Sequence, residues 1–166
     1  MKRIHTTRLL AANAILAALY AVVTILTAPL SYGLANFRLS EALIVLCCFE
    51  PSLSAGIILG CFLANFFSTV TALDIVVGTL ATVIACALTA RCHKPWLIPL
   101  PNVLVNGILV GAMLAAVLFP NQLVTGFLLA FVQVSFGEAV VMYGLGVPLY
   151  LFLRRSDLVS KLLKKS

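Results

Sequence analysis

The chain has 166 residues, of which 63% are hydrophobic and only 10% are charged, and its formal net charge is +6. A soluble domain typically contains about 45–50% apolar residues. The composition therefore excludes an ordinary water-soluble enzyme, whose interior could not bury so much apolar surface. It also excludes a disordered chain, which needs low hydrophobicity and high charge. An integral membrane protein remains.

Apolar segments suited to crossing a bilayer core of about 30 Å recur along the chain. We expect a single all-α domain, residues 1–166, with six transmembrane helices near residues 9–29, 39–50, 52–68, 72–90, 97–119 and 123–153. Pro51 separates the second span from the third, because proline lacks an N–H group and disfavours helix in the preceding residue. The turn signal at residues 119–122 separates the fifth span from the sixth.

The basic residues test this number of spans. With the N-terminus inside, only Arg38 of the 11 Lys and Arg residues lies on the outer side. This is the positive-inside pattern, so we expect both termini to be cytoplasmic. A five-span alternative would leave Arg91, Lys94 and the basic C-terminal residues outside. The basic charge thus indicates topology and not nucleic-acid binding, which would need Lys and Arg gathered on one groove-fitting face.

Ionisable residues in or beside the apolar spans are the first candidates for function, because each costs about 2.5–3.5 kcal/mol at mid-helix. Arg38 and Glu41 are three residues apart and share a helix face. Asp74 begins the fourth span, and Glu138 should lie deepest, with the other three near the outer interface. Local roles are the alternatives: an Arg38–Glu41 ion pair, and an acid at Asp74 that complements the helix dipole.

Two amides extend this set. Asn65 lies late in the third span and Asn106 in the middle of the fifth, and hydrogen bonding between helices is the alternative role for each. Polar groups from five different spans favour a ligand pocket, open to the outside, over a single structural pair. The predicted substrate-binding residues are Arg38, Glu41, Asn65, Asp74, Asn106 and Glu138.

Small residues form two stripes on the first span. Ala14 and Ala18 are four residues apart, as are Ala17 and Ala21, and such spacing lets another helix approach closely. The partner helix is either part of the same bundle or part of another membrane protein.

Signatures of energy conversion and of catalysis are missing from the sequence. It contains no P-loop, no H-E-x-x-H and no G-x-S-x-G motif. The five cysteines form no C-x-x-C pair and are expected to pack as small apolar residues. We therefore expect no catalytic residues, no metal site and no cofactor.

The segment FRLSEAL at residues 37–43 is the most specific of several motifs that the chain shares with one protein family. On these residues the sequence resembles the QueT family of substrate-binding S components of energy-coupling-factor transporters, which are associated with queuosine precursors. Further matches are FEP at 49–51, GCFLAN at 60–65, ALDIVVGTLAT at 72–82, VNG at 105–107, GE at 137–138 and GLGVPL at 144–149. The resemblance extends over nearly the whole chain.

This resemblance implies a six-helix S component in a bacterial cell membrane that captures a deazaguanine from outside. It also implies a complex with a transmembrane coupling protein and two ATPases, with Ala14 and Ala18 contacting the coupling protein. Glu138 would bind the guanine-like edge, Asp74 or Glu41 an aminomethyl group, and Phe37, Tyr32 or Trp96 could stack on the ring.

Two alternatives to a deazaguanine-binding S component remain. The chain departs from the family pattern at Cys47, at Cys48 and at residues 68–71, which favours an S component for another vitamin-like ligand. A small proton-coupled carrier or intramembrane enzyme could instead use Glu138 and Asp74 as acid–base groups.

Overall fold

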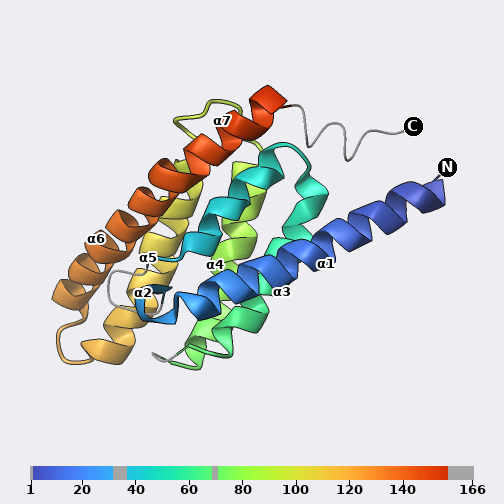
Figure 1. Ribbon diagram of the computed structural model, residues 1–166. Coiled ribbons are helices and arrows are strands. Elements are labelled where there is room, and N and C mark those ends of the chain that lie inside the picture. The colour runs from blue at the N-terminus through green and yellow to red at the C-terminus, as the bar shows by residue number, and fades with distance from the viewer. Residues whose placement is uncertain (1, 32–36, 69–70, 157–166) are drawn as a thin grey trace.

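The computed structural model describes residues 2–31, 37–68 and 71–156 (Figure 1). These residues form seven α-helices and no strands, together with two 3-10 helices and one π-helix. The α-helices are α1 (Lys2–Leu26), α2 (Ala28–Ser31), α3 (Ser54–Asn65), α4 (Leu73–Thr89), α5 (Pro99–Leu118), α6 (Leu123–Val141) and α7 (Val147–Ser156). The 3-10 helices are η1 (Leu39–Cys48) and η2 (Pro51–Leu53), and the π-helix is η3 (Met142–Gly146). The prediction of an all-helical chain is confirmed.

Each predicted span coincides with a helix or with a continuous run of helices. By length and apolar composition, three helical segments of the described chain could cross a membrane: Thr6–Leu26, Pro99–Leu118 and Leu123–Ser156. The other three apolar segments are shorter: Leu39–Cys48, Pro51–Asn65 and Leu73–Thr89. The presence of exactly six crossings therefore stays a prediction, as does their orientation.

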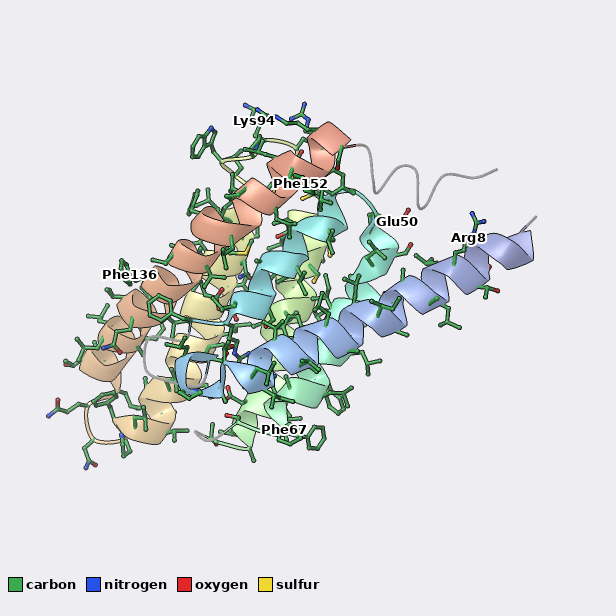
Figure 2. The ribbon with its side chains drawn as sticks, in the orientation of Figure 1. Arg8, Glu50, Phe67, Lys94, Phe136 and Phe152 are labelled. Atoms are coloured by element: carbon green, nitrogen blue, oxygen red, sulfur yellow. The ribbon has the colours of Figure 1, made fainter. Side chains whose placement is uncertain are left out.

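The outer surface of the bundle is apolar. Val76 on α4 and Val132 and Phe136 on α6 are each more than 60% exposed, and Figure 2 shows Phe136 pointing away from the bundle. Contiguous apolar surface of this kind marks contact with a membrane or a protein partner. The structure thus agrees with the composition in describing a membrane protein.

Helix η1 lies in the middle of the bundle, where it contacts α1, α3, α4, α6, α7 and η3. Figure 1 shows it as the cyan helix between α1 and the rod formed by α6 and α7. Its ten residues rise about 2.0 Å each, against 1.5 Å in an α-helix, so the 3-10 form lengthens a short segment. The centre of the fold is therefore a helix whose surroundings are protein on nearly every side.

Two glycines let α1 and α3 approach closely. The Gly56 N–H donates to Asn13 Oδ1 over 2.6 Å, and a Cβ on Gly60 would lie 2.7 Å from both the Ala17 carbonyl oxygen and Tyr20 Cβ. Ala17 is buried at this crossing. The helix–helix contact thus depends on the absence of side chains on α3.

Replacing Gly60 by alanine is expected to destabilise the protein by about 1–3 kcal/mol, because the new methyl group must push α1 away from α3. Thermal unfolding of the detergent-solubilised protein measures the effect. Gly144 is the matched control, since a Cβ there meets nothing within 4 Å. Equal melting temperatures for the two alanine variants would contradict the close contact.

Candidate functional site

A cluster of polar side chains lies inside the bundle, although the surrounding helices are apolar. All of its members are at most 3% exposed. They are Arg38, Glu41, Asn65, Asp74, Asn102, Asn106 and Glu138. We refer to these seven residues as the polar cluster.

Arg38 and Asp74 form an ion pair at one side of the polar cluster. Arg38 has an extended backbone just before η1, and its Nη2 lies 3.7 Å from Asp74 Oδ1. Asp74 lies in the first turn of α4, where its charge also complements the helix dipole, and it accepts a hydrogen bond from the Ser68 hydroxyl. The carboxylate of Asp74 is therefore held between a cation and a hydroxyl donor.

Asn65 joins this ion pair to the end of α3. Its Nδ2 donates to the backbone oxygen of Asp74 over 2.9 Å. Gly78 of α4 makes room for both neighbours, because a Cβ there would lie 2.9 Å from Asn65 Nδ2 and 3.4 Å from Arg38 Nη1. A glycine at this position thus allows the guanidinium and the amide to pack against the α4 backbone.

Glu41 lies in the first turn of η1 and binds a residue of α1. The Tyr20 hydroxyl donates to Glu41 Oε1 over 2.5 Å, and both side chains are fully buried. Glu41 also interacts electrostatically with Arg38. Its Oε2 is buried and has no hydrogen-bond donor among the described residues.

Glu138 of α6 binds an amide of α5. Asn102 Nδ2 donates to Glu138 Oε2 over 2.8 Å, and Asn106 Nδ2 donates to Asn102 Oδ1 over 2.9 Å. Asn102 also interacts with Glu41. Glu138 Oε1 is buried, and no donor reaches it from the part of the chain that the structure describes.

These contacts connect all six residues that the sequence predicts for the site. A chain of pairwise interactions crosses the bundle, running in order through Asp74, Arg38, Glu41, Asn102 and Glu138. Asn65 joins this chain at Asp74, and Asn106 joins it at Asn102. The alternative role for Arg38, a local ion pair with Glu41, does not account for all its contacts. Arg38 interacts electrostatically with Glu41, but it also forms an ion pair with Asp74 of another helix.

Two residues of this network were missed by the sequence analysis, Tyr20 and Asn102. Asn102 is four residues before Asn106, so both lie on one face of α5, and that spacing could have identified it. Tyr20 is a single hydroxyl-bearing aromatic residue within an apolar helix, and only its contact with Glu41 distinguishes it.

Arg38, Glu41 and Asp74 were expected near the outer interface, with Glu138 deepest. In the structure Arg38 and Glu41 are enclosed by protein about as completely as Glu138, and Asn102 interacts with both glutamates. Helix η1 begins inside the bundle, where Arg38 pairs with Asp74 of α4. The depth of these residues in the membrane stays a prediction.

Of the three aromatic residues proposed for stacking, Phe37 directly precedes Arg38 in the chain. Its ring packs edge-on against the exposed Phe136 of α6, with the centroids 6.4 Å apart. Trp96 is 73% exposed in the segment between α4 and α5 and lies outside the cluster. Tyr32 lies outside the described residues.

The two alanine stripes of α1 face different ways. Ala17 and Ala21 are buried within the bundle, where Ala17 packs against Gly60. Ala14 and Ala18 are exposed on the outer side of α1. The structure thus assigns Ala17 and Ala21 to internal packing and leaves Ala14 and Ala18 accessible.

Three acceptor oxygens of the polar cluster have hydrogen-bonding capacity that the described residues do not use. Glu41 Oε2, Asn65 Oδ1 and Glu138 Oε1 are buried oxygens without a donor among the described residues. Buried polar atoms are normally hydrogen-bonded, so these oxygens suit a ligand rich in N–H donors. The described residues include no group of three or more His, Cys, Asp or Glu side chains that could hold a metal ion.

Apolar helices around a buried polar cluster are typical of multi-pass membrane proteins, the class to which membrane transporters belong. Residues 10–155 match the model of one protein family, described as QueT transporter. The match extends over nearly the whole chain, and the chain therefore belongs to the QueT transporter family, which is not a family of enzymes. No curated protein and no solved structure matches the chain.

Proposed function

We propose that this protein is the substrate-binding S component of an energy-coupling-factor importer, and that it captures a queuosine precursor, a deazaguanine, from outside a bacterial cell. The observation that carries the proposal is the set of buried acceptor oxygens on Glu41, Asn65 and Glu138. A deazaguanine with an aminomethyl group offers amino, ring N–H and ammonium donors to such oxygens. Membership of a transporter family supports the same reading.

Glu138 is the residue proposed to bind the guanine-like edge. That edge presents an amino group beside a ring N–H, and two parallel N–H donors match one carboxylate. Asn102 already satisfies Oε2 of Glu138 and orients the carboxylate, which leaves Oε1 and the remaining lone pair of Oε2 for the ligand. The carbonyl oxygen of the base needs a donor, for which Arg38, Asn65 and Asn106 are the candidates.

Glu41 is the better candidate for the aminomethyl group. Asp74 already interacts with the Arg38 guanidinium and with Ser68, whereas Glu41 Oε2 has no donor among the described residues. An ammonium group at Glu41 would form a charge-assisted hydrogen bond there. Asp74 then has the role of holding Arg38 in place.

A titration calorimetry experiment on the purified protein tests the proposed ligand. We expect an aminomethyl deazaguanine to bind and to be displaced by related deazaguanines. Anionic vitamins such as biotin should not compete, because the cluster contains three carboxylates and one guanidinium. Tight binding of another vitamin without binding of any deazaguanine would overturn the proposed substrate.

Uptake driven by a proton gradient without ATPase subunits would instead support a proton-coupled carrier.

Six crossings with both termini in the cytoplasm are part of the proposal. Helix α1 begins and α7 ends at the same end of the bundle (Figure 1). Lys94 and Glu50 lie at that end, whereas Phe67 lies at the opposite end (Figure 2). An even number of crossings explains both placements, and the basic residues would then face the cytoplasm.

The partners proposed are a transmembrane coupling protein and two ATPases, since the chain has no P-loop. The exposed stripe of Ala14 and Ala18 is the proposed contact with the coupling protein, because small side chains allow close helix packing.

Replacing Ala18 by tryptophan should reduce uptake and co-purification of the coupling protein at least tenfold, because the indole ring would hold the partner helix away. Ligand binding by the isolated protein should not change. Val132→Trp, which alters an exposed position on α6, is the matched control. Equal co-purification of the two variants would remove this stripe from the interface.

A further inference from the structure

Glu41 and Glu138 come from different helices, and both interact with Asn102. Asn102 donates to Glu138 Oε2 and also interacts with Glu41. The two carboxylates are close enough to interact electrostatically, and both are 0% exposed. They therefore form a pair of acids within the protein interior.

The described groups that face this pair contain little positive charge. Tyr20 from α1 and Cys61 from α3 are neutral at physiological pH in their ordinary states, and α5 contributes the amides of Asn102 and Asn106. Arg38 is the cation of the polar cluster, and it also interacts with Asp74 of α4. One guanidinium thus serves three buried carboxylates.

Two like charges that share a buried site are not both retained unless a cation compensates them. A proton is the simplest compensation, and a proton on one carboxyl would also provide a donor within a site that has unused acceptors. Each acid of the pair has one such oxygen, Glu41 Oε2 and Glu138 Oε1.

We propose that the Glu41–Glu138 pair holds one proton when the site is empty, and that a cationic ligand displaces this proton on binding. The inference rests on the proposed function, because the ammonium group of an aminomethyl deazaguanine is the displacing cation. The balance is one positive charge entering the site and one proton leaving from a carboxyl oxygen to water. The net charge of the interior is then the same before and after binding.

The direction of the pH dependence follows from this exchange. At low pH the proton competes with the ligand, so affinity falls as pH falls, and it rises with pH while the ligand remains an ammonium ion. Release of one proton corresponds to a change of about tenfold in the dissociation constant for each pH unit.

Calorimetry of the purified full-length protein in two buffers tests the exchange. Phosphate and Tris have different ionisation enthalpies, so at one pH the difference in binding heat gives the number of protons released. We expect about one proton for the aminomethyl deazaguanine and about none for its neutral cyano analogue. Glu41→Gln should reduce the proton release by the aminomethyl compound to near zero, and Gln133→Ala, an exposed change on α6, should leave it unchanged.

The outcomes separate the two proposals. If the aminomethyl compound binds with heats that do not depend on the buffer and with an affinity that does not depend on pH, the proton exchange is wrong and the substrate assignment stands. If no deazaguanine binds, the proposed function fails and the exchange fails with it. The wild-type measurements decide the matter even if Glu41→Gln does not fold.

Discussion

Replacement of Glu138 by glutamine is expected to weaken binding of an aminomethyl deazaguanine by about 100-fold, the largest effect of any single conservative change in the site. A hydrogen bond to a charged group contributes about 1.5–3 kcal/mol, and a dissociation constant changes tenfold for each 1.4 kcal/mol. Glutamine keeps the shape of Glu138 and can still accept from Asn102. It replaces one acceptor oxygen by an amino group, which would face the donors of the ligand.

Titration calorimetry of the purified variant measures this loss. Gln133→Ala is the control, because it removes an exposed polar side chain from the same helix. A circular dichroism spectrum and a melting temperature like those of the wild type would show that the fold is kept. An unchanged affinity in Glu138→Gln would remove this residue from the binding site.

Replacement of Arg38 by glutamine is expected to destabilise the protein by about 3–5 kcal/mol. The change leaves the buried Asp74 carboxylate without the guanidinium that lies 3.7 Å away, and an uncompensated buried charge has a cost of this size. For a chain of this length the melting temperature should fall by roughly 10 °C. Arg8→Gln is the control, since Arg8 lies on the exposed surface of α1.

A second substitution distinguishes loss of charge balance from loss of packing. Combining Arg38→Gln with Asp74→Asn places two neutral amides at the same position, so at least half of the lost stability should return. Thermal unfolding of the single and double variants in the same detergent gives the comparison. If the double variant melts no higher than Arg38→Gln, the ion pair does not explain the role of Arg38.

Much of the fold follows from the sequence because a bilayer imposes simple rules. Apolar segments must be helical, since their backbone groups have no water to bind, and the breaks at Pro51 and at residues 119–122 coincide with the ends of helices. The 3-10 form of η1 was not predicted. It depends on contacts with helices distant in sequence, and these contacts determine how far a short segment must reach.

The residues of the candidate site could be predicted from the sequence where a single charged residue interrupts an apolar span. Glu138 and Arg38 stand out because a charge within an apolar span is costly. The pairings were not predictable, because Arg38–Asp74 and Tyr20–Glu41 join residues from different helices. Sequence spacing reports only neighbours on one helix, as for Arg38 and Glu41 or Asn102 and Asn106.

Helix α1 touches both the site and the surface proposed for the partner. Tyr20 reaches inward to Glu41, and Ala18, two residues earlier on the same helix, faces outward. Because a helix moves as a rigid rod over so short a distance, any rolling or sliding of α1 displaces both residues at once. The inner hydrogen bond and the outer contact surface are thus mechanically linked, so a subunit bound to the outer face of α1 would also restrict the position of Tyr20.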